Sequence, residues 1–90
     1  MVKVKIHKRD LVWDEWNIKH IARHNVKQAE VEEIFAQAVR AKKSYKGRLV
    51  VFGKTKNKRL LAVVLEKENK GYYVLSSRTA SRKERIDLLK

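Results

Sequence analysis

Apolar and polar residues alternate at the start of the chain, with the period of a half-buried strand. Val2, Val4 and Ile6 are separated by Lys3 and Lys5, so the apolar side chains are expected to share one face. Residues 11–13 are apolar again. This second segment is predicted to extend the first strand or to re-enter the sheet.

Two helices are predicted after this strand region. Asp14 is a suitable N-cap for a helix over residues 15–24, and Asn25 can adopt the left-handed conformation that often follows a helix. A second helix is predicted over residues 28–39, where apolar residues recur with helical spacing. Its apolar stripe consists of Val31, Ile34, Phe35, Ala38 and Val39.

The second half of the chain has the pattern of strands. Residues 48–54, 59–66 and 72–78 are rich in β-branched, aromatic or leucine residues, and short connections suited to hairpins separate them. Residues 42–45 can form a further strand that turns at Lys46-Gly47. Ser81 and Glu84 have the spacing of a capping box, which predicts a C-terminal helix. We therefore predict an α+β fold: a single domain over residues 1–90, with an antiparallel meander packed by two N-terminal helices and a C-terminal helix.

Composition narrows the class of protein. Ninety residues of which 43% are hydrophobic suit one globular domain, and the longest apolar run, residues 60–65, is far too short to cross a membrane. The absence of Cys excludes a disulfide scaffold and a thiolate metal site, and three His without Cys argue against structural zinc. No signal-peptide pattern is visible. We expect a cytoplasmic protein with no cofactor, no metal and no membrane association.

Positive charge is concentrated in the predicted meander and last helix. Residues 1–39 contain seven Lys/Arg and six Asp/Glu, whereas residues 40–90 contain sixteen and four, a net charge of +12. A sheet with so much unbalanced charge repels itself and is expected to meet a polyanion or an acidic partner. RNA or DNA is the first candidate.

Several short segments have the order and spacing of one known family. They are Trp13-Asp14-Glu15, His20, Arg23-His24-Asn25-Val26, Glu30, Glu33, Gly47-Arg48, Gly53-Lys54-Thr55, Arg59-Leu60-Leu61, Ser76-Ser77-Arg78 and Ser81-Arg82-Lys83-Glu84-Arg85. Over residues 11–85 the chain thus resembles the BrnT-type toxins of type II toxin–antitoxin systems. It departs from their pattern at three positions: Asn25 and Lys58 stand where Gly is usual or frequent, and Ser77 replaces a common Ala.

The resemblance implies a fold, an activity and a partner. The fold is similar to that of the RelE/ParE group, and the activity is that of a ribonuclease toxin that inhibits translation. The partner is an acidic antitoxin with a ribbon-helix-helix DNA-binding part, which covers the active face in a complex such as a heterotetramer and represses the operon.

Two histidines are candidates for acid–base chemistry. Metal-independent RNA cleavage needs a base for the 2′-hydroxyl, cations for the charged phosphorane and an acid for the leaving oxygen. His20 and His24 are spaced i, i+4, and we predict that they share a helix face with Trp13 and Trp16. They can serve as acid and base. Alternatively, they pack against the tryptophans and hydrogen-bond to the sheet.

Two arginines are candidates for stabilising the transition state. Arg78 ends the last predicted strand just before the capped helix, where its guanidinium can fork onto a phosphate. The alternative is a surface arginine or one paired with a carboxylate. Arg59 opens the central strand and can supply a second cation, or it is a solvated hairpin residue. Glu84 can act as a general base, although the capping box explains its position.

Six further cations are candidates for RNA binding. Three crowd a predicted hairpin tip, and three lie in the first turn of the last helix, where the helix dipole disfavours cations and an external anion is therefore indicated. They are Lys54, Lys56, Lys58, Arg82, Lys83 and Arg85. Solvated side chains are the alternative. Three hypotheses follow: a toxin endoribonuclease, a non-catalytic basic nucleic-acid-binding module, and an interaction protein whose charge serves only to bind an acidic antitoxin.

Overall fold

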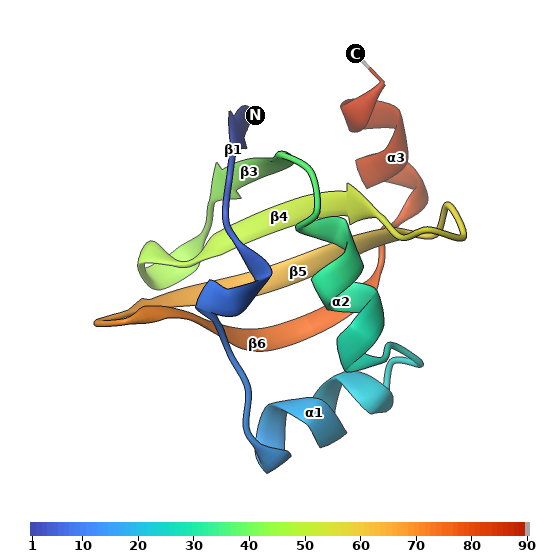
Figure 1. The fold of residues 1–90 in the computed structure, drawn as a ribbon. Coiled ribbons are helices and arrows are strands. Elements are labelled where there is room, and N and C mark those ends of the chain that lie inside the picture. Colours follow the sequence, from blue (N-terminus) through green and yellow to red (C-terminus); the bar gives the residue numbers. More distant parts are fainter. Residues whose placement is uncertain (90) are drawn as a thin grey trace.

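Six strands form one sheet in the order β1-β3-β4-β5-β6-β2 in the computed structural model, which describes residues 1–89 (Figure 1). Neighbouring strands are antiparallel, except that β2 runs parallel to β6. The strands are β1 (Val2–Val4), β2 (Leu11–Val12), β3 (Val39–Lys43), β4 (Leu49–Lys54), β5 (Leu60–Glu68) and β6 (Gly71–Thr79). The predicted α+β class and the antiparallel meander are confirmed, but the strand predicted over residues 42–45 is β3 over Val39–Lys43. Residues 11–12 re-enter the sheet at the edge opposite β1 rather than extending the first strand.

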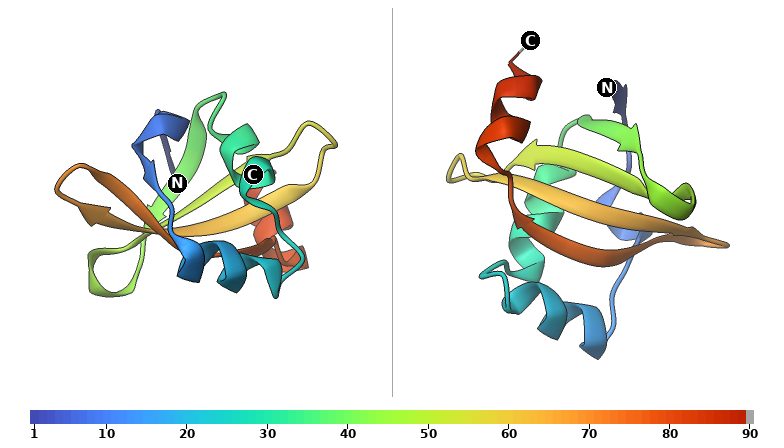
Figure 2. Two further views of the ribbon diagram at one scale, coloured as in Figure 1. Left: turned by 60° about the horizontal axis from the view of Figure 1, so that its bottom comes forward. Right: turned by 180° about the vertical axis from the view of Figure 1, so that it is seen from behind.

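Three helices cover the two faces of the sheet (Figures 1 and 2). Helices α1 (Glu15–Ala22) and α2 (Gln28–Ile34) pack on one face, and α3 (Arg82–Leu88) packs against the other. Because side chains of a strand alternate between faces, Val51 and Phe52 of β4 contribute to different cores. The larger core lies under α1 and α2, and a small one of Phe52, Ala62 and Ala80 lies beside Leu88 of α3.

Helix α2 approaches the sheet at Gly53 of β4. A Cβ atom added to Gly53 would lie 2.8 Å from the Cβ atom of Ile34, closer than side-chain atoms pack. Glycine therefore permits the close contact that holds α2 on this face.

Helix α1 begins and ends where local chemistry dictates. The Asn17 N–H donates to Asp14 Oδ1, and the Asp14 N–H donates to Asn17 Oδ1, both at 2.9 Å, so the start is capped reciprocally. The helix ends at Ala22, two residues before the predicted end, and Asn25 has the left-handed φ of 60° that the sequence predicts for this turn.

Helix α2 is shorter than the predicted range of residues 28–39. It ends at Ile34 with Phe35 as its C-cap, and Val39 is instead the first residue of β3, where it pairs with Val4. Two turns of helix already bury Val31, Ile34 and Phe35. The β-branched Val39 is buried in the sheet. Pairing with β1 gives its backbone the hydrogen bonds that it would otherwise make in a longer helix. None of the three helices described is long and apolar enough to cross a membrane.

Candidate nucleic-acid interface

A basic groove of about 510 Å³ lies between α3 and the neighbouring end of the sheet. Its apolar lining includes Phe52, Leu60 and Leu88. Five cations line it, and no carboxylate of residues 1–89 does so. The cations that define the basic groove are Lys3, Arg40, Lys54, Lys58 and Arg85.

The cations reach the basic groove from segments far apart in the sequence. Lys3 of β1 lies opposite Arg40 of β3, and Arg40 lies opposite Phe52 of β4, so strand register places them side by side on the face that carries α3. The Arg40 Nη1 donates to the carbonyl oxygen of Leu88 at 2.9 Å, which joins β3 to the end of α3. Lys54 ends β4, and Lys58 follows in the hairpin.

Within residues 1–89, no carboxylate forms an ion pair with a groove cation. Residues 1–89 contain four ion pairs, whose cations are Lys19, Arg48, Arg59 and Arg78. The five positive charges of the basic groove therefore act together on a concave surface, and such a surface attracts anions strongly.

Arg78 lies on the same face of the sheet but binds Glu84. It is opposite Ala62, a member of the small core that also contains Phe52. Its Nη1 and Nη2 donate to the two carboxylate oxygens of Glu84 at 2.7 and 3.0 Å, a bidentate pair. The guanidinium of Arg78, which was predicted to bind a phosphate, thus binds a carboxylate. This is the alternative that the sequence left open for Arg78.

The same contact determines the ionisation of Glu84. The hydrogen bonds from Arg78 lower its pKa to about 2, and hydrogen bonding with Ser81 adds to the effect. The Ser81 N–H donates to Glu84 Oε1 at 2.8 Å, as the predicted capping box requires. Glu84 is therefore a stable anion and a weak base while Arg78 holds it.

Arg59 lies on the opposite face, where hydrogen bonds tie three segments together. Its Nη1 donates to the carbonyl oxygen of Asn25 at 2.7 Å and to both oxygens of Glu30 at 3.2 Å. Its Nε and Nη2 donate to the hydroxyl of Thr79 at 3.1 and 2.9 Å. Arg59 is therefore neither a solvated hairpin residue nor a neighbour of Arg78 in a common site.

The two histidines remain adjacent but lie away from the basic groove. The His20 ring stacks on Trp16, with ring centroids 4.8 Å apart and planes 8° apart, and the His24 ring meets His20 edge-on at 5.7 Å. Trp13 is not part of this row of stacked rings, because it packs against the larger core. Helix α1 packs on the other face of the sheet, and both histidines belong to α1 and the turn after it, whereas Arg78 lies on the face that carries α3.

The predicted RNA-binding cations are divided among three places. Lys54, Lys58 and Arg85 line the basic groove. Arg82 and Lys83 are exposed in the first turn of α3, outside the lining. Sequence reasoning missed Lys3 and Arg40. The one sequence feature that could have found them is alternation: each cation lies between two apolar residues of a strand and therefore points away from the larger core.

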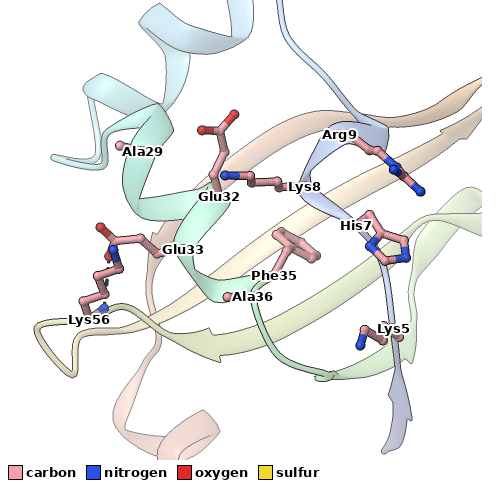
Figure 3. A pocket seen from close by; sticks show the side chains of 10 residues that line it. All are labelled: Lys5, His7, Lys8, Arg9, Ala29, Glu32, Glu33, Phe35, Ala36 and Lys56. Carbon is pink, nitrogen blue, oxygen red and sulfur yellow. Dashed lines mark hydrogen bonds between the residues drawn. The ribbon is translucent and has the colours of Figure 1, made fainter.

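Lys56 belongs to a second groove, of about 610 Å³, between α2 and residues 5–9 (Figure 3). The backbone N–H of Lys56 donates to Glu33 Oε1 at 3.0 Å. Lys8 points across the groove toward Glu32 (Figure 3). Because cations and carboxylates face one another here, the second groove attracts anions less than the basic groove does.

No model of a known protein family matches the chain, and no curated protein matches it either.

Proposed function

We propose that the protein binds RNA in the basic groove and is the toxin of a type II toxin–antitoxin system, a metal-independent endoribonuclease. The observation that carries the proposal is the convergence of five cations in one groove, where residues 1–89 supply neither an ion-pair partner for them nor a carboxylate in the lining. Lysine and arginine side chains neutralise successive phosphates, and release of counterions then drives binding. The resemblance to BrnT-type toxins supports RNA as the target and cleavage as the outcome.

Binding in the basic groove is expected to depend on the RNA backbone more than on the bases. Among residues 1–89, Phe52 is the only aromatic residue in the lining, and it is 2% exposed, so no base can stack on it. Contacts to phosphates position a strand without reading its sequence. We therefore expect weak sequence preference from this surface alone.

The chemistry we propose begins with an exchange at Arg78. A phosphate takes the place of the Glu84 carboxylate on the guanidinium, which has the bidentate geometry that phosphate also prefers. The released carboxylate regains basicity, because its hydrogen bonds with Arg78 are the main cause of its low pKa. Glu84 then lies beside the bound phosphate and accepts the proton of the 2′-hydroxyl, while the 2′-oxygen forms a bond to phosphorus. The P–O5′ bond breaks, and the leaving 5′-oxygen takes a proton from water or from the protonated Glu84.

A pair of charge-matched variants tests the binding site. In the groove variant, Lys54, Lys58 and Arg85 are all replaced by Gln; in the control, Lys5, Lys8 and Arg9 of the second groove are replaced. The groove variant is expected to bind a fluorescent single-stranded RNA at least tenfold more weakly. Its log–log salt slope should be smaller by about 2, the value for three lost phosphate contacts. Equal losses in both variants would show that net charge alone governs binding.

Cleavage is tested separately, in the presence of a chelator. The protein is expected to cut RNA and leave cyclic-phosphate ends, to spare the 2′-deoxy analogue, and to lose this activity in Arg78→Ala and Glu84→Gln. RNA that is bound in the basic groove but stays intact would support the second candidate, a non-catalytic RNA-binding module. One observation favours that candidate: both predicted catalytic arginines are hydrogen-bonded to carboxylates.

The proposed partner is an acidic antitoxin of the ribbon-helix-helix type. The five groove cations, which no carboxylate of residues 1–89 neutralises, suit an acidic segment as well as RNA. The antitoxin is expected to displace RNA from the basic groove and to relieve inhibition of translation in a cell-free assay. A cognate antitoxin that binds without displacing RNA would show that it contacts a surface other than the basic groove, contrary to the proposal.

A further inference from the structure

Helix α1 presents a histidine pair that the proposed RNA site does not use. His20 lies in the last turn of α1, and His24 follows the helix in a turn that remains tightly wound, since the His24 N–H donates to the carbonyl oxygen of Ile21 at 2.9 Å. His24 is exposed, and His20 is half-buried, with its ring in contact with those of Trp16 and His24. The pair therefore lies at the surface.

The spacing of the pair is that of helix-borne metal ligands. Two histidines at i and i+4 project from one helix face, and this arrangement supplies two of the ligands in zinc-binding helices. A metal ion bound at about 2.0–2.1 Å to one nitrogen of each ring requires ring centres roughly 4.5–6.4 Å apart. The observed separation of 5.7 Å lies within this range.

We propose that His20 and His24 chelate a transition-metal ion that prefers imidazole ligands, with Cu²⁺ bound more tightly than Ni²⁺ or Zn²⁺. That order is the general one for nitrogen sites. No third His, Cys, Asp or Glu among residues 1–89 completes a cluster, so the other coordination positions are open to water or to a donor of another molecule.

The surroundings decide what such a site can do. Ile21 stands next to His20, where the zinc-protease helix motif has its general-base glutamate, and Ile21 is fully buried in the core. The proposed site therefore binds metal without a neighbouring base to activate water. Arg23 adds positive charge nearby, whereas Lys19 is paired with Glu15, so repulsion from Arg23 weakens the binding of every divalent ion alike and leaves their order unchanged.

Trp16 provides a direct readout of binding. Its ring stacks on His20 at 4.8 Å, so Cu²⁺ bound to His20 is expected to quench Trp16 fluorescence. Titration of the full chain with Cu²⁺ alone should give saturable quenching at one equivalent, and calorimetry should give the same stoichiometry. The Trp16→Phe variant should lose most of the quenching and keep the calorimetric binding.

Single-histidine variants decide between this site and others. His20→Ala and His24→Ala should each weaken Cu²⁺ binding by about a hundredfold, because a single ring loses the advantage of chelation. His7→Ala, which changes the remaining histidine, should bind as the wild type does. Circular dichroism checks that each variant is folded. Equal affinity in the His24→Ala variant, or equal loss in His7→Ala, would overturn the proposal.

Discussion

Lys58 adopts a left-handed backbone conformation, with φ of 66°, in the turn between β4 and β5. Its N–H donates to the carbonyl oxygen of Thr55 at 2.9 Å, and Thr55 is buried, so the turn is held in this shape. A residue with a Cβ atom is disfavoured in this region. At the same time, Lys58 lines the basic groove, so one residue combines backbone strain with a candidate contact to RNA.

Replacing Lys58 by Gly is expected to stabilise the protein by about 0.5–1 kcal/mol, because relief of strain exceeds the extra freedom of Gly in the unfolded chain. Urea denaturation measures the change. Lys56→Gly, at a position without positive φ, should destabilise instead. The Lys58→Gly variant should nevertheless bind RNA more weakly than the wild type. Weaker RNA binding by a Lys58→Gly variant that is as stable as the wild type would show that the Lys58 side chain contributes to RNA binding and not to folding.

Glu84 links the ionisation of one side chain to stability. Its pKa is lowered from 4.5 to about 2, mainly by hydrogen bonds from Arg78, so the pair stabilises the fold fully above about pH 4.5. This contribution is lost as the pH falls through about 2. Since Arg78 is half-exposed and solvent screens the pair, we expect about 1–2 kcal/mol.

The Glu84→Gln variant is expected to be less stable than the wild type at pH 7, with the difference shrinking as the pH falls from 4.5 toward 2. Chemical denaturation across this pH range measures the difference. Glu15→Gln is the control, because the Glu15–Lys19 pair is well exposed on α1. A difference for Glu84→Gln that does not change with pH would contradict the assignment of the pair.

At the scale of elements, Arg59 joins α2, the connection between α1 and α2, and the end of β6. It contacts Glu30, Asn25 and Thr79, which lie in three different parts of the chain. The pKa of Glu30 is lowered, first by the hydrogen bond from the Lys27 N–H and then, against the opposing effect of burial, by Arg59. Glu30 therefore serves both the start of α2 and the contact between this helix and the sheet.

Arg59→Met is expected to destabilise the protein by about 1–3 kcal/mol, since it leaves the half-buried Glu30 without its partner. Arg48→Met is the matched control. Arg48 pairs with Glu66 at the same distance, 3.2 Å, but with greater exposure, so its loss should cost less than about 1 kcal/mol. Thermal and urea denaturation give both values. Equal losses would mean that the additional contacts of Arg59 contribute nothing.

At the scale of the whole molecule, repulsion among like charges outweighs the ion pairs. The net charge is +13, and residues 1–89 contain only four ion pairs. Exposed pairs contribute about 0–1 kcal/mol each, whereas unneutralised charge opposes the compact state throughout the molecule. The protein therefore carries an electrostatic cost that a bound polyanion or dissolved salt relieves.

Raising NaCl from about 20 mM to about 500 mM is expected to raise the melting temperature, because screening reduces repulsion more than it weakens the few pairs. A short RNA should raise it further at low salt and lose this effect at high salt. Scanning calorimetry measures both. A melting temperature that falls with NaCl would show that the ion pairs, and not the net charge, dominate.

The sequence by itself determined most of the elements, because their signals are local. Alternation over residues 2–6 predicts β1, caps at Asp14 and Ser81 predict the starts of two helices, and Asn25 predicts a left-handed turn. The charge of residues 40–90 likewise pointed to the part of the chain that supplies four of the five groove cations. Local propensity did not predict that α2 ends at Ile34, since pairing of Val39 with Val4 depends on a distant strand.

Only the tertiary structure decided which candidate side chains meet. Strand pairing brings Lys3 beside Arg40, although 36 residues separate them in the sequence. The turn before α3 brings the carboxylate of Glu84 to the guanidinium of Arg78. The same packing puts His20 and Arg59 on the face opposite the basic groove. Periodicity specifies which residues share a face of one element. Which faces oppose one another depends on contacts between residues far apart in the chain, because burial of the core as a whole sets the order of the strands.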